Sequence, residues 1–542
     1  MKRALIACFL IALVATAGFA GGRQEAAATG EPLQDISWSD FDWPNELPAR
    51  PVRLDDSVYD FADLSEPMEF EMINIGFVNT PLPDTYPIRE YLAERFNTTI
   101  DLQSYNRSDH ETTLAARFAG GDGPDVAFVH RTQRDLAQRL YEAGQLLDAS
   151  LLIPYMPQFG NYVTETFARF VSFNEDEWVG FPRYPIFPNN WGMFIRQDFL
   201  DNLGMDHPTN LEELFDFAVA ATFDDPNNSG QQDTWFMGAA RGGADLGMLE
   251  EIRAFIGHPG WNVVNGRINH PMIDGTEREY LEYVFRLREA GTLAPDWFTI
   301  GWEEFKAYSL AGRIGMFRYP GYNIVQETYE TNDNDPAMLD VWAPLDPLAP
   351  TGLLAPPSGP EGMFVFNANL ANQPDRLRRI ARVIDGFAYP NPDYQNLIQG
   401  GGPAMWPDDV RYEFFPEDGT NIWFREPGTS VPERYAAMGD YQRLGITLIW
   451  EVFDAEPGIT GGQNNQAILA MPRHENFELL LSLDPDTVAD LREFQRRSEI
   501  AFVLGERSFS EWDAYVDEWL SRGGRRLLEQ AAEQLGVQMA DI

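Results

Sequence analysis

The chain has 542 residues and a formal net charge of −44 at pH 7, with 44% hydrophobic and 13% aromatic residues. This length is sufficient for two lobes that each bury a core, and the composition is too apolar for a disordered chain. The acidic excess runs along the whole sequence and repels nucleic acids and anionic membrane surfaces, so we exclude both as expected partners.

The first 20 residues are typical of a secretory signal peptide. A positively charged start is followed by an apolar stretch over residues 4–17 and by a small-residue cleavage site ending at Ala20. The apolar stretch is shorter than the roughly 20 residues that a membrane-spanning helix needs. The single cysteine, Cys8, has too little chain before it to act as a lipoprotein anchor. We therefore expect a periplasmic or secreted protein that is not a lipoprotein.

The first regular elements are predicted after a spacer and extended arm over residues 21–66. Residues 70–78 predict a strand that ends in a mostly apolar run, as in a buried parallel sheet. The following elements are a helix over 88–96, a strand over 99–103, a helix over 111–119 and a strand over 125–129. Alternation at this spacing predicts βαβ units and therefore an α/β fold.

Two later helices carry recognisable start signals. Thr209 and Glu212 predict a capping box in front of an apolar helix face. Ser510 and Asp513 predict the start of a helix with an aromatic face near the C-terminus. We assign both apolar faces to the core.

The sequence contains no recognisable catalytic motif. Its six histidines show no zinc-helix spacing, and neither a nucleophile elbow nor a phosphate-binding loop is present. The glycines over residues 120–123 link a helix to a strand, which is the wrong order for binding phosphate. Among 84 acidic residues no glycosidase-type carboxylate pair can be singled out, so an exported polysaccharide-cleaving enzyme stays an alternative.

Residues 225–233 have the spacing of a metal-binding loop. Oxygen-bearing side chains stand at alternate positions with Gly230 at the sixth, as in the first part of an EF-hand, so that these oxygens can converge on Ca²⁺. The twelfth position, which is glutamate in an EF-hand, holds Phe236. A polar turn after a helix explains the same pattern equally well.

Aromatic residues are dense in loops rich in glycine and proline. They include Trp178, Tyr184, Trp191, Trp261, Trp302, Tyr319, Tyr322, Trp406 and Trp423. Such rings stack on the C–H faces of sugars while nearby polar groups bind the hydroxyls. A single loop aromatic more often fills the core, so only a group facing one cleft would indicate sugar binding.

Several sequence segments, taken in chain order, carry a family resemblance. They are TLAARFAGGDGPDVAF (113–128), EAGQLL (142–147), WVGFP (178–182), WGMFIRQDFLDNLG (191–204), the capped helix and DDPNNSGQQD (208–233), LREAGTL (287–293), AGRIGM (311–316) and WDAY (512–515). From Pro67 onward the chain resembles the carbohydrate-type extracellular solute-binding proteins (family 1) of bacterial ABC importers. Within them it is similar to the oligosaccharide- and alginate-binding subgroup.

The resemblance implies a two-lobed periplasmic-binding-protein fold of type II that closes by a hinge around an interlobe cleft. It places lobe 1 over residues 67–186 and 363–400 and lobe 2 over 187–362. A C-terminal helical segment over 401–542 would pack mainly on lobe 2. The expected protein is a monomer without enzymatic activity that binds a carbohydrate and docks on ABC permease subunits.

The resemblance also suggests functional residues. The expected ligand-binding residues are Asn79, His130, Arg131, Tyr184, Trp191, Tyr319, Tyr322 and Trp406. The expected ligands of a structural Ca²⁺ are Asp225, Asn227, Ser229, Asp233 and, through its backbone, Gln231. Arg131, Arg183 and Arg318 would suit a uronic acid. The same fold binding a peptide or a quaternary amine in an aromatic cage is the second alternative.

Overall fold

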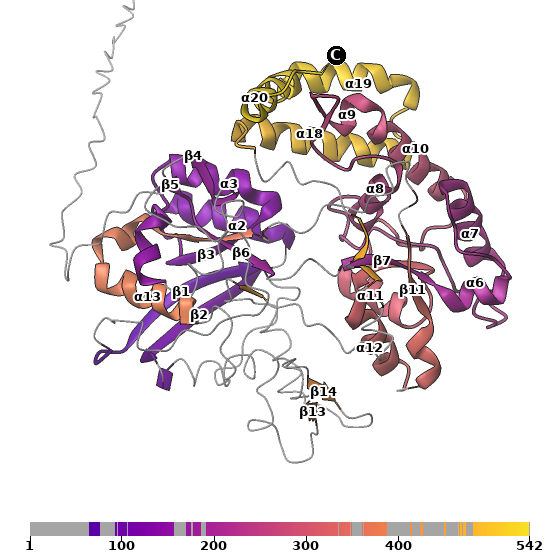
Figure 1. Cartoon of the computed structure of the whole chain (residues 1–542), viewed down its shortest axis with the longest axis horizontal. Helices are drawn as coiled ribbons and strands as arrows, with labels where there is room; N and C mark the ends of the chain where they lie inside the picture. The colour runs from indigo at the N-terminus through magenta and orange to yellow at the C-terminus, as the bar shows by residue number, and fades with distance from the viewer. Residues whose placement is uncertain are drawn as a thin grey trace, which may run out of the picture.

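The computed structural model describes residues 64–75, 96–156, 170–185, 191–348, 360–386 and 481–540, with gaps of one or two residues, and short pieces at 93–94 and between 412 and 472. The described elements form two bodies, which we call lobe 1 and lobe 2 (Figure 1). The expected signal peptide and most of the arm and of the helix over 88–96 lie outside the described residues.

Lobe 1 is built on a six-stranded mixed sheet in the order β15-β6-β12-β3-β1-β2. Its strands are β1 (Met68–Ile75), β2 (Thr98–Tyr105), β3 (Val126–His130), β6 (Phe181–Pro185), β12 (Gly362–Phe366) and β15 (Ile449–Trp450). Strand β1 pairs in parallel with β2 and β3, whereas β12 runs antiparallel to β3 and β6. The strands predicted over 70–78, 99–103 and 125–129 are therefore confirmed as β1, β2 and β3, while residues 76–78 of the first prediction lie outside the described residues.

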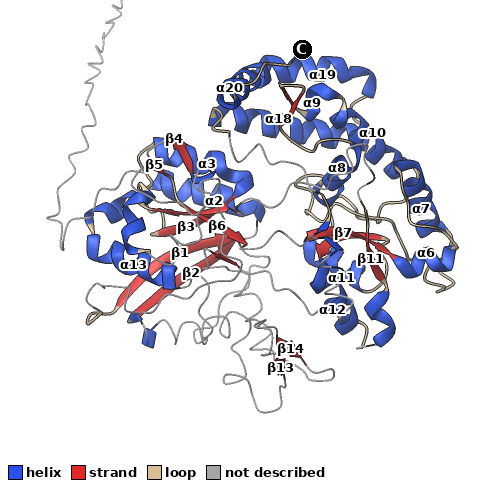
Figure 2. Cartoon of the chain, in the orientation of Figure 1, coloured by secondary structure: helices blue, strands red, loops and turns tan. Residues whose placement is uncertain are grey.

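Helices α2 (Arg107–Gly120), α3 (Arg134–Glu142) and α13 (Pro374–Gly386) pack around this sheet (Figure 2). Every residue of β12 is buried, and the core includes apolar side chains of β12, β1 and β3. Gly362 is required where β12 meets β3, because a Cβ atom there would lie 2.2 Å from the Val129 carbonyl oxygen. That close pairing aligns Gly362 with His130 at the end of β3.

Lobe 2 has a second core around the antiparallel sheet β10-β7-β11. Its main elements are β7 (Trp191–Arg196), α6 (Gln197–Leu203), α7 (Leu211–Phe223), a 3-10 helix at Gly247–Ile252, α8 (Arg253–Ile256), α10 (Thr276–Glu289), α11 (Trp302–Leu310), β10 (Met316–Pro320), α12 (Gly321–Thr331) and β11 (Trp342–Pro344). The C-terminal helices α18 (Pro485–Leu504), α19 (Trp512–Trp519) and α20 (Arg525–Leu535) contribute to the same core.

The two predicted helix starts need correction. The N-cap of α7 is Asn210, whose side chain accepts a hydrogen bond from the Glu213 amide at 3.0 Å, so the cap lies one residue later than predicted. Near the C-terminus the capping box is formed by Ser508 and Glu511, two residues earlier than predicted. In both places neighbouring Ser, Thr or Asn residues are comparable N-caps, so the sequence pattern alone does not fix which of them begins the helix.

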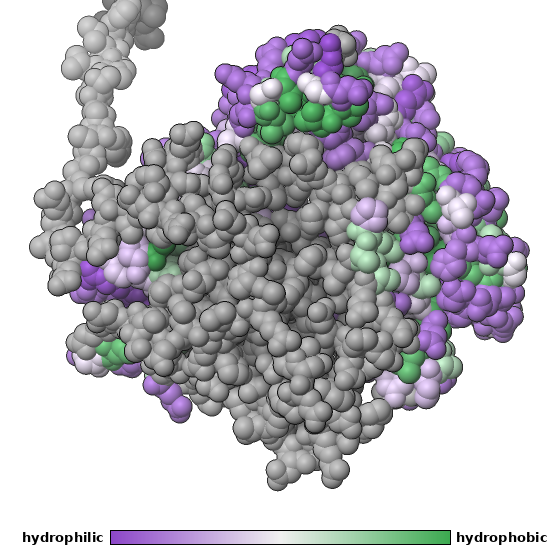
Figure 3. All heavy atoms as spheres, viewed as in Figure 1, coloured by the Kyte–Doolittle hydropathy of each residue, from purple (hydrophilic) through white to green (hydrophobic). Residues whose placement is uncertain are grey.

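The described surface of lobe 2 and the C-terminal helices is mainly hydrophilic on the face drawn in Figure 3, with smaller hydrophobic patches. None of the described helices has both the length and the apolar character needed to cross a membrane.

Candidate functional site

An aromatic cluster lies on lobe 2, at the edge where β7 begins and β10 ends. Trp191 is the first residue of β7 and pairs in register with the last residue of β10, Pro320. Its ring centroid lies 5.6 Å from that of Tyr319 and 6.1 Å from that of Trp302, the first residue of α11. The Trp302 and Tyr319 rings stack at 5.9 Å. The structure therefore brings the predicted residues Trp191 and Tyr319 together and adds Trp302.

Tyr319 is the buried base of this cluster. Its side chain is only 4% exposed, and its hydroxyl donates to the Glu327 carboxylate at 2.9 and 3.0 Å. Lys306 also forms an ion pair with Glu327, with its ammonium lying 5.4 Å from the centre of the Tyr319 ring. These contacts fix Tyr319 beneath Trp191, which is itself only half-buried.

Arg318 adds positive charge beside the aromatic rings. Its guanidinium lies 5.0 Å from the centre of the Trp191 ring and 3.2 Å from the Glu251 carboxylate, and its side chain is 22% exposed. Burial lowers the pKa of Arg318, and the positive charges of Arg131 and Arg241 act in the same direction, against Glu251. Arg131 belongs to lobe 1, so a charge of lobe 1 contributes to lowering the pKa of Arg318.

The lobe 1 contribution comes from the loop that follows β3. His130 is 8% exposed, and its Nδ1 lies 3.2 Å from the Thr132 amide nitrogen and 2.9 Å from the Thr132 hydroxyl. It thereby caps the short 3-10 helix Arg131–Gln133. Arg131, at the start of that helix, is exposed. The loop thus uses His130 to hold its own backbone and presents Arg131 to solvent.

Arg183, which the sequence analysis named as suiting a uronic acid, is not part of this group. Arg183 is buried on β6, with its guanidinium 5.2 Å from the centre of the Phe128 ring. Asn79 and Trp406, and the side chains of Tyr184 and Tyr322, lie outside the described residues and stay predictions. Glu251 and Arg241 were missed because nothing in the sequence around them indicates a ligand, whereas Trp302 belonged to the set of loop aromatics.

The five predicted metal ligands lie together in one loop after α7. The Ser229 hydroxyl oxygen lies 3.0 Å from Asp233 Oδ1, 3.3 Å from Asp225 Oδ1 and 3.3 Å from the Gln231 carbonyl oxygen. Asn227 joins them through its side-chain nitrogen, 3.0 Å from Asp233 Oδ1. Gly230 has a φ of 72°, the left-handed conformation expected of the glycine in such a turn.

The spacing of these oxygen atoms is compatible with calcium ligands and equally with the hydrogen bonds that Ser229 makes. Ligands bound to one Ca²⁺ at 2.3–2.6 Å lie roughly 3 Å apart, which is the spacing around Ser229. The loop supplies only two carboxylates, Asp225 and Asp233, and the described residues contain no group of three His, Cys, Asp or Glu side chains that could hold a metal. The Asn202 side chain donates to the Pro226 carbonyl at 2.8 Å and ties the loop to α6, so an ion there would brace lobe 2.

No protein-family model matches the sequence. A protein of Bacillus subtilis (strain 168), the polygalacturonan/rhamnogalacturonan-binding protein YtcQ, is 21% identical over 448 residues, which are 81% of this chain and 85% of YtcQ. The Streptococcus pneumoniae ABC-transporter substrate-binding protein FusA, solved in complex with kestose, has a TM-score of 0.62 at 17% identity over 86% of this chain and 99% of FusA. The alginate-binding protein AlgQ2, solved without calcium ion, has a TM-score of 0.65 at 17% identity over 88% of this chain and 99% of AlgQ2.

These likenesses confirm the predicted α/β fold of two-lobed solute-binding proteins. The similar proteins are named as binding proteins and not as enzymes.

Proposed function

We propose that this chain is the extracellular solute-binding component of an ABC importer, which captures a carbohydrate between its lobes and delivers it to a membrane permease. The observation that carries the proposal is the guanidinium of Arg318 over the half-buried ring of Trp191 on lobe 2, with the exposed Arg131 of lobe 1 adding positive charge. Arg131 of lobe 1 acts on Arg318 of lobe 2, and Arg318 lies over Trp191. The solute-binding fold and the names of the similar proteins support the same function.

The arrangement favours an oligosaccharide with carboxylate groups. The open part of the half-buried Trp191 ring can stack on a sugar face, while guanidinium groups bind carboxylates through paired charge-assisted hydrogen bonds. Glu251 neutralises only part of the charge around Arg318, because Arg131 and Arg241 also contribute. A uronic-acid oligosaccharide therefore fits better than a quaternary amine, which the same cations would repel.

In this proposal the protein binds the carbohydrate reversibly and does not cleave it. In this proposal the lobes close around the ligand by a hinge motion and the closed form is the one that docks on the permease. The N-terminal segment would direct export, with cleavage near Ala20, and the protein would work outside the cytoplasmic membrane.

Calorimetric titration with galacturonic-acid oligosaccharides tests the proposal. We expect saturable binding that weakens as salt concentration rises, because part of it is an ion-pair interaction, and weaker binding of neutral oligosaccharides of the same length. Chromatography of the incubated oligosaccharide should show no shortening. Binding of peptides or glycine betaine without binding of any sugar, or shortening of the oligosaccharide, would overturn the proposal.

We also propose that the loop over residues 225–233 binds a structural Ca²⁺ through Asp225, Asn227, Ser229, Gln231 and Asp233. Helix α7, which leads into this loop, lies on the side of lobe 2 remote from lobe 1 (Figure 1), so the ion would stabilise lobe 2 and not contact the ligand.

A further inference from the structure

Helix α18 belongs to lobe 2 through its buried residues. Leu491, Phe502 and Val503 lie in the lobe 2 core. Buried Glu499 comes within 3.8 Å of Arg253 on α8. The helix is therefore part of lobe 2.

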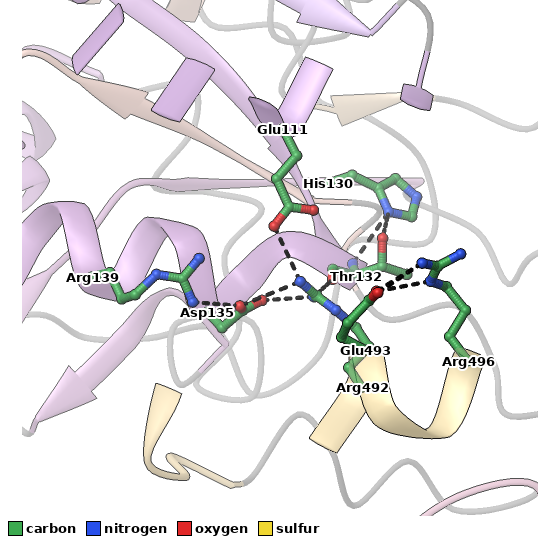
Figure 4. A network of polar contacts seen from close by, with 8 residues as sticks. All are labelled: Glu111, His130, Thr132, Asp135, Arg139, Arg492, Glu493 and Arg496. Carbon is green, nitrogen blue, oxygen red and sulfur yellow. Dashed lines mark hydrogen bonds and ion pairs between the residues drawn. The ribbon is translucent and has the colours of Figure 1, made fainter. Parts of the chain in front are cut away.

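The same helix also binds lobe 1 through Arg492 (Figure 4). The Arg492 guanidinium donates to Asp135 Oδ1 at 2.8 Å and Oδ2 at 3.4 Å, to Glu111 Oε1 at 3.1 Å and to the Thr132 carbonyl oxygen. Asp135 is only 5% exposed, and Arg139 on the next turn of α3 binds it as well at 2.8 Å. Arg492 thus spans two acidic residues and one backbone carbonyl of lobe 1.

One turn further along α18, Arg496 makes the matching contact on lobe 2. Its guanidinium donates to the Ala244 carbonyl oxygen at 2.6 Å and is held by Glu493 at 2.9 Å. Residues four apart on a helix lie on the same face. Two arginines on one face of α18 therefore each hold the backbone of a loop, and the two loops belong to different lobes.

Both loops carry a residue of the candidate ligand site. Thr132 follows Arg131 directly and is hydrogen-bonded to His130. Ala244 lies between Arg241 and Asp245, which form an ion pair at 3.2 Å. Arg131 and Arg241 are the two cations that act on Arg318. The residues that α18 binds are therefore close in sequence to Arg131 on lobe 1 and to Arg241 on lobe 2.

We propose that α18 is a strut that limits how far the two ligand-binding loops move apart when the lobes open and close, with Arg492 as the positioning residue for the lobe 1 loop. In this proposal Arg492 acts on ligand binding indirectly, because it sets where Arg131 lies and limits how far lobe 1 moves from lobe 2. Arg134 reinforces this junction, since its guanidinium donates to the Leu481 carbonyl oxygen at 2.9 Å, next to the start of α18. The expected effect of Arg492 on ligand affinity rests on the proposed function. Its expected effect on the relative position of the two lobes does not.

The strut is tested first without ligand, by hydrogen exchange and small-angle X-ray scattering on the full chain. Arg492→Met removes the charged hydrogen bonds and keeps the apolar stem. We expect amides 130–136 to exchange about tenfold faster or more, because charged hydrogen bonds of this kind are lost, and the radius of gyration to increase. Arg492→Lys should restore part of the protection, since an ammonium reaches Asp135 but cannot span all three acceptors.

Arg497→Met is the matched control. Arg497 lies on the same helix, is 74% exposed and pairs with Glu493, so its loss should leave exchange at 130–136 and the scattering unchanged. If Arg492→Met fails to fold, Glu111→Gln replaces it and should give a smaller increase in the exchange rate of amides 130–136. The strut proposal would be overturned if Arg492→Met kept the exchange rates and the radius of gyration of the unchanged protein. It would also be overturned if Arg497→Met changed them equally.

The second readout is the affinity for galacturonic-acid oligosaccharides. We expect Arg492→Met to weaken binding about tenfold, mainly through faster dissociation, and Arg497→Met to leave it unchanged. If no oligosaccharide binds even the unchanged protein while the exchange and scattering results hold, the proposed function fails and the strut stands. Unchanged affinity in the Arg492 variant would remove its positioning role.

Discussion

At the scale of single residues, Trp191 is the side chain on which the proposed ligand site most depends. Because its ring is half-buried on a base of Tyr319 and Trp302, truncation removes a stacking surface without opening the core. Trp191→Ala should weaken oligosaccharide binding about threefold to tenfold, since aromatic contacts of this kind contribute about 0.5–1.5 kcal/mol, and titration calorimetry would measure it. Trp235→Ala is the control, because Trp235 stacks on Tyr308 elsewhere in lobe 2. Equal losses in both variants would contradict a specific role for Trp191.

A second residue-scale prediction concerns buried carboxylates around Arg253. Glu277 binds Arg253 at 2.7 Å, and Glu499 lies 3.8 Å from it. Burial, with the negative charge of Glu277 next in importance, raises the pKa of Glu499 well above its ordinary value. Burial likewise raises the pKa of Glu250 to about 7, with Asp245 the next cause.

A raised carboxyl pKa means that the folded state binds the proton more tightly than the unfolded state. The corresponding stability is complete below about pH 4.5 and is lost as the pH rises toward and through the raised pKa. We expect the free energy of unfolding to fall by on the order of 1–3 kcal/mol between pH 5 and pH 8. Glu499→Gln should flatten this slope in denaturant titrations, and the exposed Glu529→Gln should not. A wild-type slope of opposite sign would refute the assignment.

At the scale of elements, the loop after α7 is stabilised by its own hydrogen bonds and, in our proposal, by Ca²⁺. Calcium should raise the melting temperature by a few degrees, and chelator should reverse the rise, because an ion that binds only the folded state stabilises it. Asp225→Asn should abolish the shift, since it removes one of only two carboxylates. Asp224→Asn, one residue earlier and outside the predicted ligand set, is the control. If calcium does not change the melting temperature, the loop is a polar turn and not a calcium site.

Elements whose residues are adjacent in sequence could be predicted, whereas contacts between distant residues could not. Strands β1 to β3 were predicted because buried parallel strands leave apolar runs, and the metal-type loop because its residues are adjacent in sequence. The contact of Arg492 with Asp135 could not be predicted, since the two residues lie 357 positions apart and neither carries a local signal. The helix starts at Asn210 and Ser508 were misplaced because several adjacent residues are comparable caps.

At the scale of the whole molecule, the two lobes have separate hydrophobic cores. Among the described residues, Arg492 and Arg134 supply hydrogen bonds between them. A cooperative unit needs extensive shared packing, and bodies joined mainly by polar contacts unfold more independently. We therefore expect scanning calorimetry of the ligand-free protein to show two overlapping transitions, which Arg492→Met separates further.

A ligand that contacts both lobes should reverse that separation. Binding adds a free energy that is lost when either lobe unfolds, so both transitions move upward and merge as the galacturonic-acid oligosaccharide concentration rises. A ligand held by one lobe would raise only that lobe's transition and leave the other in place. Calorimetric scans at increasing oligosaccharide concentration distinguish these outcomes, with a non-binding neutral oligosaccharide as control. Movement of a single transition would contradict capture between the lobes, even if the affinity were high.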